Sequence, residues 1–137
     1  MNNYEYYNYM NNNYNVPNYN QEKQPELYNP YNGFIRGNLF PSLYNPYKIE
    51  KPYEIKPLNE QAEMLTYIDA INFACHELNL YLDINPDDSK MIDLYNQYSL
   101  ESKKLMERYQ DAYGPLLVSF DEKTPWSWKS SPWPWEV

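Results

Sequence analysis

Two stretches of the chain place apolar residues at helical spacing. Between residues 58 and 114 the apolar side chains recur at steps of three, four or seven, the period of one helix face. The first stripe consists of Met64, Ile68, Ile71, Cys75, Leu78 and Leu82; the second consists of Met91, Leu94, Tyr98, Leu105, Tyr109 and Ala112, interrupted by Ser102. The pattern predicts two long α-helices.

Start and stop signals flank both predicted helices. Asn59 is the expected N-cap of the first helix. The second helix is predicted to begin at Asn85-Pro86-Asp87-Asp88, with Asn85 as its N-cap, and to end at Tyr113-Gly114-Pro115. The first stripe ends at Leu82, so the connection to the second helix at Asn85 is very short. A short connection forces neighbouring helices to run antiparallel, and the predicted fold is therefore all-α, built on an antiparallel two-helix hairpin.

The flanking segments have a different composition. Residues 1–24 form an Asn/Tyr-rich, low-complexity leader in which no packed fold is expected. Residues 25–57 carry six prolines, which predict an extended, turn-rich arm whose Leu39 and Phe40 could lie on a surface. Residues 58–137 would then hold the hairpin and a Trp-rich tail.

Phe73 and Leu80 fall on the side of the first helix that faces away from the hairpin seam. A helix that is apolar on opposite faces is normally buried on both. Something is therefore expected to cover the far face. The candidates are the Trp-rich tail, the proline-rich arm, a second copy of the chain or another protein.

All four tryptophans lie within the last thirteen residues, in two Pro-Trp-x-Trp units. Each indole carries a large apolar area, and the prolines hold the segment extended, so the tail is interpreted as a docking element that packs on the hairpin, on another protein or on both. The predicted partner-binding residues are Phe73, Leu80, Trp126, Trp128, Trp133, Trp135, Leu39 and Phe40.

The net charge of −8 changes the range of possible partners. Eleven acidic and four basic side chains lie between residues 58 and 114. Nucleic acid and anionic membrane are disfavoured, because phosphate binding needs clustered Lys and Arg. The sequence also has no apolar run long enough to cross a bilayer, and it lacks a secretion signal, so synthesis and retention on the cytoplasmic side are expected.

The sequence offers little for catalysis. Cys75 and His76 are adjacent, but neighbouring helical residues point about 100° apart, and a lone Cys on an apolar stripe is commonly a small buried hydrophobe. Position 80, where a zinc-binding helix would need a second His, is Leu. We therefore predict no catalytic, cofactor-binding or metal-binding residues, and a Cys/His enzyme remains the disfavoured alternative.

From about Ile68 to Val137 the chain resembles the bacterial spore coat family CotJB. The matching motifs are Phe73-Ala74-Cys75-His76-Glu77-Leu78-Asn79-Leu80-Tyr81-Leu82-Asp83, Asn85-Pro86-Asp87-Asp88, Tyr113-Gly114-Pro115-Leu116 and Pro132-Trp133-Pro134-Trp135-Glu136-Val137. Upstream, the segment from Gly37 to Tyr47 is similar to the short companion family CotJA. Together the resemblances imply a CotJA-like arm at 25–57 fused to a CotJB-like domain at 58–137.

The resemblance implies a structural protein of the endospore coat that is made in the mother cell. It further implies a partner, CotJC, that resembles manganese catalases and would carry the metal chemistry. The hypothesis is thus a non-catalytic adaptor that assembles with a manganese-catalase-like coat protein. The alternative is a self-assembling coat brick that acts through homotypic contacts as a homo-oligomer.

Overall fold

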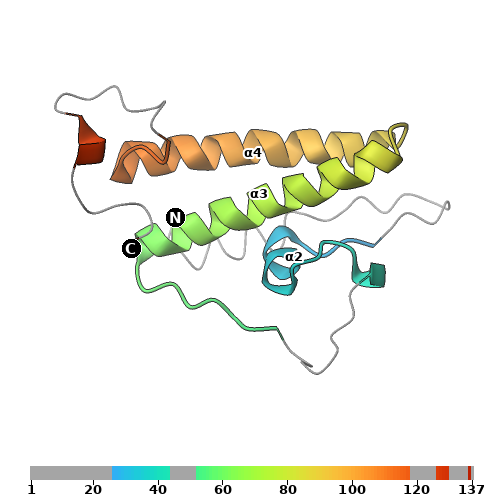
Figure 1. Ribbon diagram of the computed structural model, residues 1–137, viewed down its shortest axis with the longest axis horizontal. Helices are drawn as coiled ribbons and strands as arrows, with labels where there is room; N and C mark the ends of the chain where they lie inside the picture. Colours follow the sequence, from blue (N-terminus) through green and yellow to red (C-terminus); the bar gives the residue numbers. More distant parts are fainter. Residues whose placement is uncertain (1–25, 44–51, 118–125, 130–135, 137) are drawn as a thin grey trace.

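The computed structural model describes residues 26–43, 52–117, 126–129 and 136. Over these residues the elements are all helical, which confirms the predicted all-α class (Figure 1). The α-helices are α2 (Pro30–Arg36), α3 (Glu60–Ile84) and α4 (Ser89–Tyr113), and the short 3-10 helices are η1 (Pro41–Leu43) and η3 (Ser127–Lys129). The leader at 1–24 lies outside the described residues.

Helices α3 and α4 form the predicted antiparallel hairpin (Figure 1). Each has 25 residues, which corresponds to a length of about 38 Å. Their seam buries residues of both predicted stripes, namely Ile68, Ile71, Leu78, Met91, Tyr98, Leu105 and Tyr109. The period of the apolar positions therefore identified the faces that pack together.

Two positions on the second stripe behave differently from the other members. Ser102 is buried, and its hydroxyl donates a hydrogen bond to Oδ1 of Asn72 on α3 at 2.6 Å, so the polar group has a partner across the seam. Ala112 is exposed. Gln61, in the first turn of α3, donates to the Tyr109 hydroxyl at 2.8 Å, so α3 begins opposite Tyr109 and the seam ends before Ala112.

The helix caps confirm one prediction and correct another. Asn59 is the N-cap of α3, and its side chain accepts from the Ala62 N–H at 2.7 Å. The second helix begins three residues later than predicted, because Asp88 is its N-cap and accepts from the Met91 N–H at 3.2 Å. Asn85 instead ends α3, with its N–H donating to the Tyr81 carbonyl. Both residue types are good caps, and apolar spacing does not choose between them.

The end of α4 matches the sequence expectation in position. Gly114 is the C-cap, with a φ of 108° and a ψ of 174°. That combination lies in a region that is essentially restricted to glycine, rather than in the left-handed helical region that is common for a glycine at a helix C-terminus. Glycine therefore turns the chain away from the helix at the predicted residue, but by a different backbone path.

Residues 25–57 are not extended throughout, because they contain α2. Asn29 is its N-cap and accepts from the Asn32 N–H at 2.8 Å, while Pro30 occupies the first helical position, where the missing N–H costs nothing. Gly37 ends the helix in the left-handed conformation, with a φ of 67°. The N–H groups of Gly37 and Asn38 donate to the carbonyls of Phe34 and Gly33, which is a Schellman motif.

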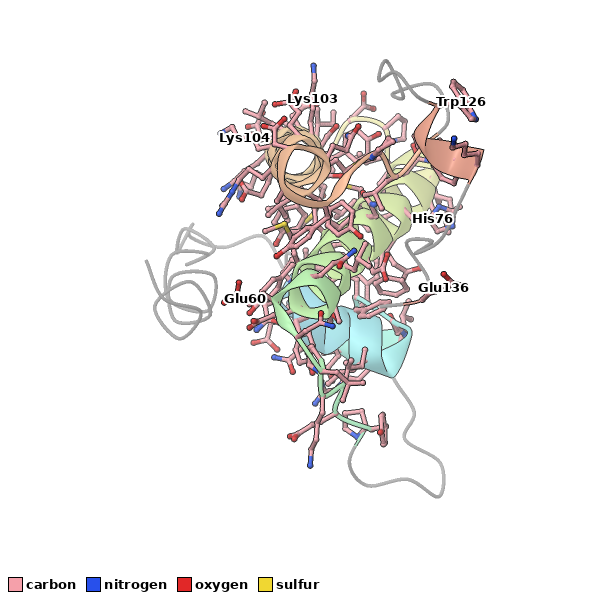
Figure 2. All side chains as sticks on the ribbon, turned by 90° about the vertical axis from the view of Figure 1, so that its left-hand side faces the viewer. Glu60, His76, Lys103, Lys104, Trp126 and Glu136 are labelled. Carbon is pink, nitrogen blue, oxygen red and sulfur yellow. The ribbon has the colours of Figure 1, made fainter. Side chains whose placement is uncertain are left out.

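Helix α2 lies on the side of α3 opposite to α4, so α3 is the middle of three helical layers (Figures 1 and 2). Part of the proline-rich arm thus belongs to the folded unit. Within the described part of the chain, none of the helices combines the length and the apolar character that crossing a membrane requires.

Candidate interaction surfaces

The chain's own arm covers part of the far face of α3, for which the sequence left four candidate covers open. The ring of Phe34 on α2 lies 6.1 Å from the ring of Phe73 on α3, at an interplanar angle of 57°. This tilted arrangement is favourable for two aromatic rings. Phe73 is consequently half-buried within the chain and packs against α2.

Leu39 and Phe40 also pack on α3. Leu39 is 0% exposed, and its backbone N–H donates to Oε2 of Glu77 at 3.2 Å. The ring of Phe40 stacks on that of Tyr81, with 5.3 Å between the centroids. The surface on which we expected these two side chains to lie is therefore provided by the chain itself.

The arm that carries these contacts is closed on itself. The N–H of Tyr28 donates to the carbonyl of Leu39 at 2.9 Å, which joins the two ends of the α2 segment. Between them Gly33 allows Leu39 to approach α2 closely, since a Cβ at position 33 would lie 3.1 Å from Cδ1 and 3.3 Å from Cα of Leu39. The segment from Tyr28 to Phe40, which we call the arm unit, docks on α3 as one piece.

Tyr81 links the arm unit to the turn of the hairpin. Besides stacking on Phe40, its hydroxyl donates to Oδ2 of Asp88 at 3.1 Å. Burial, the hydrogen bond to Asp88 and the negative charge of Asp88 all raise the pKa of the Tyr81 phenol above its ordinary value. The neutral phenol is the form that the fold stabilises.

Other predicted docking residues remain exposed. Leu80 is 48% exposed on α3, one turn before Ile84, which is 83% exposed. Because residues four apart share a helix face, the two form a single apolar patch, which we call the turn-end patch. The sequence analysis missed Ile84, although its spacing from Leu80 carried the signal. Leu43, at the end of η1, is also exposed.

The tail presents a second apolar surface. Trp126 is 49% exposed, and Figure 2 shows it at the outer edge of the molecule, beside α4. Trp128 is half-buried in η3. Trp133 and Trp135 lie outside the described residues. Figure 1 shows η3 near the end of α4, whereas Leu80 and Ile84 lie near the turn at the far end of the hairpin.

Cys75 and His76 do not make a nucleophilic pair. Cys75 is half-buried and packs against the hairpin core, and burial raises the pKa of its thiol. A reactive thiol needs the opposite shift, because the thiolate is the nucleophile. His76 is exposed on α3 (Figure 2). Over the described residues, no three His, Cys, Asp or Glu side chains gather in a group that could hold a metal ion.

A cavity of about 270 Å³ lies between the arm unit, the segment 54–57 and the first half of α3. Its described lining residues are Tyr31, Asn32, Ile35, Glu54, Ile55, Pro57, Glu63, Thr66 and Tyr67. The hydroxyl of Tyr31 donates to the carbonyl of Ile55 at 3.4 Å, which joins two of the three walls. The sequence analysis gave no hint of this site, because its walls come from three separate segments.

Comparison with known protein families identifies one for most of the chain. A protein-family model described as CotJB protein matches residues 62–136, which include nearly all of α3, the whole of α4 and η3. The arm unit and the CotJA-like segment at 25–57 lie outside that match. No curated protein and no solved structure matches the chain.

Proposed function

Because the chain belongs to the CotJB family of spore coat proteins, we propose that it acts as a non-catalytic adaptor that joins a manganese-catalase-like protein to the endospore coat. Synthesis in the mother-cell cytoplasm and assembly into the coat are part of this proposal. The manganese-catalase-like partner is proposed because the resemblance to the CotJ proteins implies it. Burial raises the pKa of the Cys75 thiol and so disfavours its thiolate, which supports a role without catalysis.

One observation carries the adaptor role: among the apolar side chains that stay exposed, two sets lie near opposite ends of the hairpin. The turn-end patch of Leu80 and Ile84 lies at one end of the hairpin, and η3, which directly follows Trp126, lies near the other (Figure 1). An adaptor has to hold two neighbours, and two contact points about a helix length apart suit that task. Contiguous apolar side chains such as Leu80 and Ile84 are typical of protein-binding surfaces, and Trp is the residue type most enriched in interface hot spots.

The proposed partner-binding residues are accordingly Leu80 and the tail tryptophans Trp126, Trp128, Trp133 and Trp135, together with Ile84. Leu39, Phe40 and Phe73 are instead assigned to contacts within the chain, because they pack on Glu77, Tyr81 and Phe34.

Cross-linking mass spectrometry on intact spores tests the proposal, since lysines mark three parts of the molecule. Lys90 lies near the turn-end patch, and Lys129 follows Trp128. Lys103 and Lys104 project from the outer face of α4 and serve as an internal control (Figure 2). We expect cross-links from Lys90 and Lys129 to a manganese-catalase-like protein and none from the two control lysines.

The other outcomes discriminate between the alternatives. Cross-links that join only copies of this chain would replace the adaptor with the self-assembling coat brick. Absence of the chain from spores would refute assembly into the coat. Links to the partner that arise only from Lys103 and Lys104 would move the contact surface to α4 and contradict the assignment of Leu80 and Trp126.

A further inference from the structure

The cavity between the arm unit and α3 is a built site with walls from three segments. Helix α2 contributes Tyr31, Asn32 and Ile35, the segment 54–57 contributes Glu54, Ile55 and Pro57, and α3 contributes Glu63, Thr66 and Tyr67. The helical residues follow spacings of one, three and four, so each helix turns one face toward the space. The cavity exists only because the arm unit docks on α3.

The lining is acidic and aromatic. Glu54 and Glu63 are its charged members, and no Lys or Arg is among the described lining residues. The nearest basic group on α2 is Arg36, whose guanidinium lies 4.6 Å from the centre of the Tyr28 ring and donates to the carbonyl and Oδ1 of Asn32. The carboxylates of the cavity thus lack a lining cation, which favours a positively charged ligand.

The other lining side chains suit an organic cation better than a bare metal ion. Tyr31 and Tyr67 bring two phenol rings, which attract ammonium groups, and Ile35 and Ile55 offer an apolar wall for a hydrocarbon stem. A volume of about 270 Å³ is slightly below that of pockets that hold drug-sized ligands. The space fits one alkyl chain with a terminal charge.

We propose that this cavity binds an alkylammonium group, the chemistry shared by a lysine side chain and a free polyamine. The ammonium lies between Glu54 and Glu63, and the alkyl stem lies against Tyr31, Ile35 and Ile55. This binding activity is independent of the coat adaptor role, since it rests on the cavity alone.

The test is an NMR titration of the ¹⁵N-labelled full chain with n-butylammonium chloride. The controls are n-butanol, which has the same stem without the charge, and NaCl at equal ionic strength. Saturable shifts at the amides of the lining residues, with a dissociation constant on the order of millimolar, are the expected result. Equal shifts with n-butanol, or shifts without saturation, would overturn the proposal.

Matched variants locate the site. Glu63→Gln should weaken binding about five-fold, the effect of one carboxylate near a cation at high dielectric constant. Glu107→Gln removes a carboxylate from α4, outside this cavity, and should leave binding unchanged. Tyr31→Leu should weaken binding, because it removes an aromatic ring from the lining. If Glu63→Gln binds as tightly as the unmodified chain, the assignment is refuted.

Two further ligands identify the source of the ammonium group. A blocked lysine, N-acetyl-lysine methylamide, that binds more tightly than n-butylammonium would indicate a lysine of another polypeptide. Tighter binding of spermidine would indicate a free polyamine. If neither ligand competes with n-butylammonium at the lining residues, the proposed chemistry is refuted.

Discussion

At the scale of single residues, Tyr81 connects more parts of the structure than its half-buried position suggests. Its ring stacks on Phe40 of the arm unit, its carbonyl accepts from the N–H of Asn85, and its hydroxyl donates to Asp88, the N-cap of α4. One side chain on α3 thereby contacts the arm and fixes the turn. A substitution that removes only the hydroxyl separates these roles.

Tyr81→Phe retains the ring stack and loses the hydrogen bond to Asp88. We expect the free energy of unfolding at about pH 8 to fall by about 0.5–1.5 kcal/mol, the usual net contribution of one intramolecular hydrogen bond. Urea unfolding followed by circular dichroism measures the difference. An unchanged midpoint would show that the bond to Asp88 contributes nothing.

The raised pKa of Tyr81 adds a pH dependence with a definite sign. Because the folded state holds the phenol proton more tightly than the unfolded state, the stabilisation is complete below the ordinary pKa of about 10 and decreases as the pH rises through the raised value. The stability difference between the unmodified chain and Tyr81→Phe should therefore shrink between about pH 8 and about pH 11. A stability difference that stays constant over this pH range would contradict the expectation.

At the scale of elements, the sequence analysis predicted the hairpin and missed α2. The long stripes on α3 and α4 specify which faces meet, because many apolar positions agree on one period. In the arm, prolines were interpreted as helix breakers. Pro30 instead opens a helix, because it follows the N-cap Asn29 and precedes the left-handed Gly37 by seven residues. That combination was present in the sequence and could have revealed α2.

The candidate surfaces were predictable only in part, because apolar spacing describes one helix and not the segment that packs on it. Spacing shows that Phe73 and Leu80 share the far side of α3, and it requires a cover for that side. It does not show which segment supplies the cover, because packing between distant segments leaves no local pattern. The structure divides the pair: Phe73 meets Phe34, and Leu80 stays exposed. The cavity between α2 and α3 was missed for the same reason.

The divided pair gives a direct comparison. Phe73→Ala should lower the free energy of unfolding by about 1–2 kcal/mol, because a half-buried ring loses its packing against Phe34. Leu80→Ala should change it by less than about 0.5 kcal/mol, as is usual for exposed positions. Denaturant titration of both variants tests this. Equal effects would mean that α2 does not stabilise α3 through Phe73.

At the scale of the whole molecule, α3 is the central helix, with α4 on one side and the arm unit on the other. Leu39 is the most deeply buried side chain of the arm unit. Displacing it would bare the apolar face of α3 without disturbing the seam with α4. The arm therefore determines how much apolar surface the molecule presents.

Leu39→Asp tests that role. The new carboxylate would be buried beside Glu77, at a cost of several kcal/mol, so the arm unit should leave α3. We expect most of the helical circular dichroism to remain, with a rise in the binding of an apolar dye and larger species in size-exclusion chromatography. Leu43→Asp, at a position 71% exposed, is the matched control and should behave like the unmodified chain. A monomeric Leu39→Asp with no added dye binding would contradict the expectation.

The attachment of the arm unit to the same polypeptide as α3 also governs competition for that helix. Sixteen residues separate η1 from α3, so docking is an intramolecular event with an effective concentration on the order of millimolar. A free peptide that imitates the arm would have to exceed that concentration to displace it at equal intrinsic affinity. The tether thus reserves one face of α3 for the chain itself and leaves the exposed side chains elsewhere on the hairpin for other proteins.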